Sequence, residues 1–165
     1  MPANDISASD FDREPGLDDW RVLLGRIEAR YLAPTFIAAS DFIRAVADAA
    51  ELAGHHPDVD LRYPGYVHIS VTTHDAKHLT EADVDLARTI TTLARHAALT
   101  SQPLAQSAVE VAIDALDIDA VRPFWKAVLG YEDEPPRSPG GKVIALVDPL
   151  HIGPAFWFQQ MDAPR

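Results

Sequence analysis

A Pro64-Gly65 dipeptide separates two short segments in which apolar and polar residues alternate. Alternation with a period of two is typical of a β-strand that buries one face, and Pro-Gly is a turn dipeptide. The sequence therefore predicts an antiparallel hairpin over residues 58–71. The alternating apolar residues are Val59, Leu61, Tyr63, Val67, Ile69 and Val71.

An amphipathic helix pattern lies on each side of this hairpin. The first pattern runs from a candidate N-cap at Ser40 to about residue 53, and Gly54 is a suitable helix stop. The second begins at Thr80, has Asp83 three residues later as in a capping box, and continues to about residue 98.

An alternating segment at residues 26–31 adds a strand before the first helix. The predicted order is βαββα, which is the order of an α+β unit with two helices packed on one face of an antiparallel sheet.

The composition limits the classes of function. The 165 residues include no cysteine, so disulfides, thiolate catalysis and cysteine-ligated zinc are excluded. A formal net charge of −11 argues against a nucleic-acid partner, which needs a basic surface. No run of about 18 apolar residues predicts a membrane span. The first residues are acidic and polar, unlike a signal peptide, and we expect a cytoplasmic protein.

The turn residues divide the chain. We expect a flexible leader over residues 1–16, a first domain over 17–99, a linker over 100–107 and a second unit over 108–165. In the second unit the pattern predicts a strand at 108–114, a helix at about 118–129, a Pro- and Gly-rich loop, and strands at 142–147 and 155–160.

Histidines are concentrated between residues 51 and 83. This segment holds five of the seven histidines, which are His55, His56, His68, His74 and His78. His55 and His56 follow the end of the first helix, and His74 follows the end of the hairpin, so both places lie at the same end of the predicted sheet. Glu51 and Asp83 flank them, and a carboxylate beside an imidazole favours acid–base chemistry near neutral pH.

Other interpretations of these residues compete with the acid–base one. A metal site would use the same residue types, but adjacent histidines on an extended backbone point to opposite faces, so we predict no metal. Asp83 also suits a plain helix cap, and Glu51 a solvated helix position. His68 fits the solvent face of its strand, and His78 an exposed loop.

The motif Glu51-x-x-x-His55-His56-Pro57, followed by Tyr63, Thr73-His74 and Leu79-Thr80-x-x-Asp83, resembles the pterin-4a-carbinolamine dehydratases. Trp20 before the first strand and the Leu86-Ala87 pair in the second helix also agree with that family. The resemblance covers roughly half of the chain, and the motif is specific to the family.

The resemblance implies an enzyme that removes water from 4a-hydroxytetrahydropterin to give quinonoid dihydropterin, in the recycling of the tetrahydrobiopterin-type cofactor. It implies catalytic roles for His55, His74 and Asp83, with Asp83 holding His74, and substrate binding by His56 and Glu51. It implies no cofactor, because the pterin is the substrate, and a homodimer or homotetramer as the assembly.

The second unit is similar to one βαβββ module of the glyoxalase/bleomycin-resistance superfamily, on the residues 109–114 and the run Phe124-Trp125-x-x-Val128-Leu129-Gly130-Tyr131. Glu110 stands about where such proteins often place a first metal ligand, but we expect a structural role for a single carboxylate that has no histidine partner on the neighbouring strands. Two alternatives to the dehydratase remain: a non-catalytic dimerisation or binding module, and a metal-dependent glyoxalase-like enzyme centred on the second unit.

Overall fold

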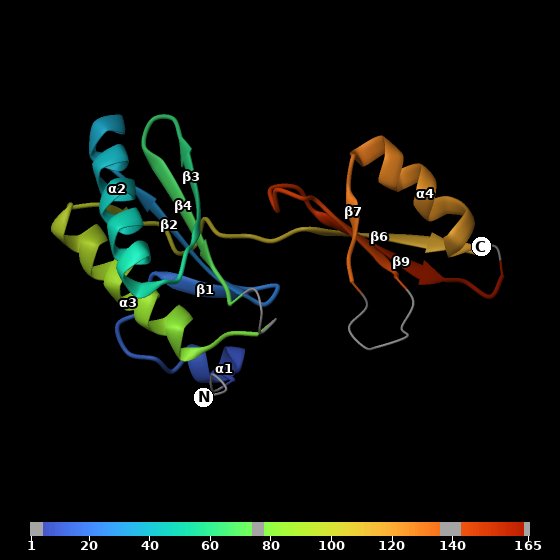
Figure 1. Ribbon diagram of the computed structural model, residues 1–165, viewed down its shortest axis with the longest axis horizontal. Helices are drawn as coiled ribbons and strands as arrows, with labels where there is room; N and C mark the ends of the chain where they lie inside the picture. The colour runs from blue at the N-terminus through green and yellow to red at the C-terminus, as the bar shows by residue number, and fades with distance from the viewer. Residues whose placement is uncertain (1–4, 74–77, 136–142, 164–165) are drawn as a thin grey trace. The chain divides into compact units, whose positions relative to one another are not determined.

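The computed structural model describes residues 5–73, 78–135 and 143–163, and the chain divides into two compact units, residues 1–107 and 108–165 (Figure 1). Each unit has its own sheet. Within these described ranges, no helix has the length and the apolar character that crossing a bilayer requires.

The first unit contains an antiparallel sheet with the strand order β1-β2-β4-β3, and a short β5 also pairs with β2. The predicted hairpin of β3 and β4 is confirmed, with Val59 opposite Ile69. The elements are α1 (Ala8–Phe11), β1 (Trp20–Leu23), β2 (Arg26–Leu32), α2 (Phe36–Ala53), β3 (Asp58–Arg62), β4 (Tyr66–Val71), α3 (Glu81–His96) and β5 (Thr100–Ser101).

The core of this unit lies between the sheet and the helices α2 and α3, which pack side by side over one face of the sheet (Figure 1). Every second residue of β2 and β4 points into the core, as the alternation predicts. The α+β fold class with two helices on one face is therefore confirmed. The inward strand residues are Ile27, Ala29, Tyr31, Val67, Ile69 and Val71, and the helices add Phe42, Val46, Leu86 and Ile90.

A buried polar contact joins the first strand to the second helix. Trp20 Nε1 donates a hydrogen bond of 2.9 Å to Thr91 Oγ1, and both residues are 2% exposed. A buried indole N–H without a partner is costly, so this bond fixes where α3 lies along β1.

Two sequence expectations about the N-terminal region are wrong. Residues 5–16, the described part of the expected leader over 1–16, are not simply flexible, because α1 begins at Ala8 and Phe11 is buried in the core. The helix α2 begins one turn before Ser40. Thr35 is its N-cap and its hydroxyl accepts the N–H of Ala38 at 3.0 Å, whereas the Ser40 hydroxyl donates back to the carbonyl of Phe36.

The segment 100–107, expected to be a linker, contacts the first unit. Thr100 and Ser101 form β5 on the edge of β2, and the N–H of Gln102 donates to the carbonyl of Arg30 at 2.7 Å. The side chain of Gln106 donates to the carbonyl of Asp19. Sequence periodicity misses this strand because it is only two residues long.

The second unit has the βαβββ order that its resemblance implies, with a four-stranded sheet in the order β6-β9-β8-β7. The first strand pairs in parallel with the last one, and the other pairs are antiparallel. Phe156 packs against Trp125 of the helix, at 5.9 Å between ring centroids. The elements are β6 (Glu110–Ala115), α4 (Ile118–Leu129), β7 (Glu132–Asp133), β8 (Ala145–Val147) and β9 (Ala155–Gln160).

Candidate functional site

The end of α2 carries the first site histidine out of the helix. Gly54 adopts a left-handed conformation with φ 62°, which only glycine adopts without strain. The N–H of His55 then donates to the carbonyl of Ala50 at 3.1 Å and satisfies one of the last helical carbonyls. Because Pro57 cannot continue the helix, the chain passes from His55 directly into β3.

The start of α3 supplies the partner of this histidine. Asp83 lies in the first turn of α3, and its side chain is completely buried. His55 Nε2 lies 2.8 Å from Asp83 Oδ1, and the imidazole is 15% exposed. The packing of α2 against α3 thus joins two residues that the motif places far apart in the sequence.

The second carboxylate oxygen of Asp83 is also occupied. Oδ2 accepts the backbone N–H of Thr80 at 2.7 Å and the hydroxyl of Thr73 at 2.8 Å. The Thr80 hydroxyl lies 3.2 Å from the same oxygen. Asp83 is therefore both a helix cap and a histidine partner, which are the two roles that its sequence position allowed.

The hydroxyls of Thr73 and Thr80 are the site groups that sequence reasoning missed. Thr73 stands beside His74 in the motif and Thr80 is a recognised cap, but spacing alone cannot show that both side chains turn toward one carboxylate. Thr73 and His78 form an isolated antiparallel bridge, which fixes Thr73 next to the start of α3.

The remaining predicted site residues are placed differently. His56 Nε2 lies 3.2 Å from Glu51 Oε1, and both side chains are exposed, at 59% and 78%. His74 lies outside the described residues. The resemblance implies that Asp83 holds His74, which stays a prediction, and the histidine contact of Asp83 that the structure describes is with His55.

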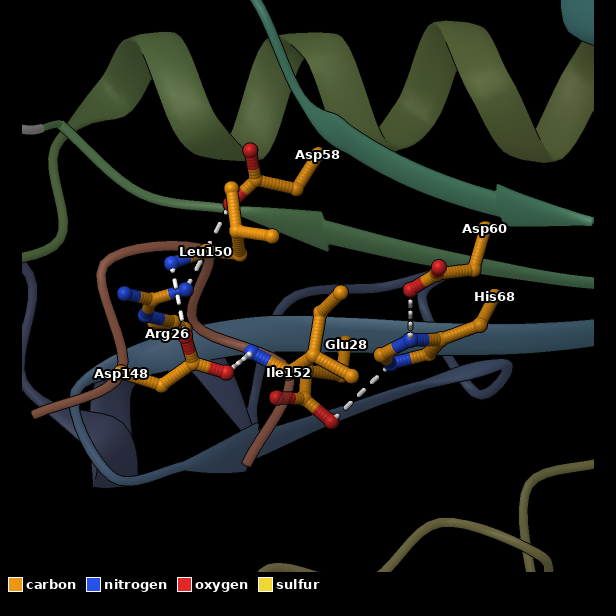
Figure 2. A network of polar contacts seen from close by, with 8 residues as sticks. All are labelled: Arg26, Glu28, Asp58, Asp60, His68, Asp148, Leu150 and Ile152. Atoms are coloured by element: carbon orange, nitrogen blue, oxygen red, sulfur yellow. Dashed lines mark hydrogen bonds and ion pairs between the residues drawn. The ribbon is translucent and has the colours of Figure 1, made fainter. Parts of the chain in front are cut away.

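Two other histidines of the segment lie apart from Asp83. His68 lies on the sheet face opposite the helices, where its Nε2 is 3.2 Å from Glu28 and its Nδ1 is 3.7 Å from Asp60 (Figure 2). These carboxylates come from the neighbouring strands β2 and β3. His78 forms an ion pair with Asp5. Neither histidine contacts His55 or Asp83 among the described contacts.

No three His, Asp or Glu side chains come together as a metal-binding group in residues 5–73, 78–135 and 143–163. The two carboxylates beside His68 contact opposite ring nitrogens, so they cannot share one ion with it. Glu110 is exposed on β6.

Comparison with known proteins agrees with the motif. The family model described as pterin 4 alpha carbinolamine dehydratase matches residues 4–93, and one described as glyoxalase-like domain matches residues 110–165. A relative from Acidobacterium capsulatum is 45% identical over 82 residues, which cover 50% of this chain and 88% of the relative. A relative from Herpetosiphon aurantiacus is 49% identical over 71 residues, which cover 43% and 73%. Both relatives are named "Putative pterin-4-alpha-carbinolamine dehydratase".

A solved structure shares the fold. A crystal structure from Brucella melitensis, titled transcriptional coactivator/pterin dehydratase, matches with a TM-score of 0.52 and 26% identity, and covers 55% of this chain and 99% of that one. The family model spans more than half of the chain and includes His55 and Asp83. The chain therefore belongs to the pterin-4a-carbinolamine dehydratase family and has a glyoxalase-like segment after the dehydratase unit.

Proposed function

We propose that the first unit removes water from 4a-hydroxytetrahydropterin to give quinonoid dihydropterin, by histidine acid–base catalysis. The observation that carries the proposal is the 2.8 Å contact between His55 Nε2 and the buried carboxylate of Asp83. Family membership supplies the substrate class, and the recycling of a tetrahydrobiopterin-type cofactor in the cytoplasm is part of the same proposal.

The reaction needs a proton donor and a proton acceptor. The hydroxyl leaves carbon 4a as water once it has gained a proton, and the neighbouring ring N–H loses its proton as the C=N bond forms. Imidazole can serve either step near neutral pH, and a buried carboxylate stabilises the imidazolium that forms. His55 takes one of these two roles, and we assign the other to His74 on the motif.

The other two predicted site residues, His56 and Glu51, bind and orient the pterin in this proposal. His56, the residue after His55, forms an exposed pair with Glu51, and the two can contact the polar edge of a pterin. Because the reaction is a loss of water from the pterin itself, it needs neither a metal nor an organic cofactor.

The test is dehydration of freshly made 4a-hydroxytetrahydropterin by wild type and by His55→Ala and His74→Ala. We expect each variant to lose about 10²-fold or more in rate. His96→Ala is the matched control, because His96 lies in the last turn of α3. A wild-type rate equal to the uncatalysed background would exclude the enzyme. Full activity in both variants would exclude the residue assignment.

The assay also separates the alternatives. A metal-dependent enzyme centred on the second unit would lose its activity in a chelator, whereas we expect dehydration to be unchanged.

We further propose that the protein assembles as a homodimer or homotetramer. Exposed apolar side chains of the first unit, Ile37, Leu52 and Tyr63 among them, support an interface between copies. Light scattering coupled to size-exclusion chromatography measures the assembly, and a monomer would contradict it.

A further inference from the structure

Thr73 contacts the carboxylate that contacts His55. Its Oγ1 lies 2.8 Å from Asp83 Oδ2 and 2.8 Å from Thr80 Oγ1. Asp83 and Thr80 are 0% and 1% exposed, and Thr73 is half-buried. The hydroxyl of Thr73 is therefore part of a set of polar groups that surrounds a carboxylate buried from water.

The number of available protons fixes the direction of each bond. A carboxylate only accepts hydrogen bonds, and a threonine hydroxyl has one proton to donate. If Thr73 donates to Asp83 Oδ2, its 2.8 Å contact with Thr80 requires Thr80 to donate to Thr73. The longer distance of 3.2 Å from the Thr80 hydroxyl to Oδ2 agrees with this order. The protons thus run from Thr80 to Thr73 to Asp83.

This arrangement commits the two oxygens of Asp83 to different partners. Oδ2 accepts the Thr73 hydroxyl and the Thr80 N–H, at 2.8 and 2.7 Å, and Oδ1 remains for His55 Nε2. Since the carboxylate cannot donate, Nε2 of His55 must carry the proton of that bond. The second ring nitrogen, Nδ1, is then the one that exchanges protons with a substrate.

We propose that Thr73 is a positioning residue: its hydroxyl fixes the rotation of the Asp83 carboxylate, which keeps Oδ1 in contact with His55 Nε2 and so holds neutral His55 as its Nε2–H tautomer. The effect on dehydration rests on the proposed function, whereas the effect on the tautomer does not. Asp83 Oδ2 also accepts the backbone N–H of Thr80, and a side-chain change at Thr73 leaves that helix-capping bond in place.

The experiment compares Thr73→Val, which has nearly the same shape without the hydroxyl, with Thr73→Ser, which keeps the hydroxyl. The first readout is the pair of side-chain ¹⁵N chemical shifts of His55, assigned by their loss in His55→Gln. We expect a single Nε2–H tautomer in wild type and in Thr73→Ser, and a mixture of tautomers in Thr73→Val. Thr92→Val removes an exposed hydroxyl that bonds to the Arg88 carbonyl, and is the matched control.

The second readout is dehydration. We expect kcat to fall about tenfold in Thr73→Val with little change in KM, and to recover in Thr73→Ser, because a misoriented base slows the chemical step more than it weakens binding. A single Nε2–H tautomer in Thr73→Val, with or without a slower rate, would overturn the proposal.

Wild type alone provides a test if Thr73→Val does not fold. A His55 signal of the Nδ1–H tautomer in wild type would also overturn the inference. A wild-type protein with the expected tautomer but no dehydration would overturn the proposed function and leave the positioning role standing. The two failures are therefore distinguishable.

Discussion

The imidazole of His55 and the carboxylate of Asp83 meet across 28 residues of sequence, with Nε2 and Oδ1 2.8 Å apart. Asp83→Asn should slow dehydration by about 10²-fold or more. An amide whose oxygen accepts from Thr80 and Thr73 presents its NH₂ group to His55, so donor would face donor. We also expect a loss of about 1–3 kcal/mol in the free energy of unfolding.

The control for this substitution is Asp85→Asn on the same helix. Asp85 is exposed and contacts Arg88 at 3.3 Å, and an exposed pair of this kind contributes little. Steady-state dehydration and chemical denaturation should leave Asp85→Asn close to wild type. A wild-type rate for Asp83→Asn would show that the carboxylate acts only as a helix cap.

The buried bond from Trp20 to Thr91 predicts a stability effect without a direct effect on the site. Thr91→Val keeps the shape of the side chain but leaves the indole N–H of Trp20 without its acceptor. We expect the free energy of unfolding to fall by about 1–3 kcal/mol. Denaturant unfolding followed by tryptophan fluorescence measures it, and Thr92→Val on the exposed side of α3 is the control. Equal stability of the two variants would contradict the prediction.

The second unit depends on few buried side chains. Phe158 is 2% exposed, and Phe158→Ala should cost about 3–5 kcal/mol. The unit should then unfold, while dehydration stays at the wild-type rate because His55 and Asp83 belong to the first unit. Two-dimensional NMR distinguishes the units. Phe124→Ala is the control, since Phe124 is 61% exposed. Loss of the signals of both units together would contradict their independence.

In the loop before β9, Gly153 lies close to the side chain of Tyr131. A Cβ at Gly153 would lie 2.0 Å from the hydroxyl oxygen of Tyr131, whose ring packs against Phe156. Gly153→Ala should therefore destabilise the second unit by about 1–3 kcal/mol. The cost should shrink in a Tyr131→Phe background, which removes the clashing oxygen. Thermal unfolding of the four proteins measures this coupling, and purely additive effects would contradict it.

Acid should weaken the second unit through Asp133. The Lys126 side chain, by its hydrogen bond, and the nearby charge of Arg122 hold the pKa of Asp133 below its ordinary value of 3.8. A carboxyl whose pKa is lower in the folded state stabilises it above the unfolded pKa, and that contribution disappears as pH falls through the folded pKa. The stability difference between wild type and Asp133→Asn should therefore shrink below about pH 4. A difference that stays constant from pH 6 to pH 2 would contradict it.

The parts of the fold that could be predicted from sequence are those with a repeating pattern. Alternation in 58–71 predicted the hairpin, and Gly54 and Thr80 marked a helix end and a helix start correctly. The start of α2 was placed too late because Ser40 is as good a cap in isolation as Thr35. Strands of two residues, such as β5 and β7, are too short for any period to show.

The site could be predicted only as a set of residues. The motif identified His55 and Asp83, but which histidine meets the carboxylate depends on how α2 packs against α3. The same limit applies to Thr73, which a backbone bridge to His78 places beside the start of α3, where its hydroxyl reaches Asp83. His68 was expected on the solvent face, and its contacts with Glu28 and Asp60 depend on the strand register, which the hairpin pattern alone does not give across β2.

The parallel pairing of β6 with β9 has a consequence for the order in which the protein forms during translation. In the described sheet β9 lies between β6 and β8, so the first strand of the second unit has no neighbour until the residues of β9 have been synthesised. Such non-local pairing slows folding, whereas the hairpin of the first unit joins segments only a few residues apart. Domains that emerge first fold first. The dehydratase unit can therefore complete its core on the ribosome while the glyoxalase-like segment is still an open chain.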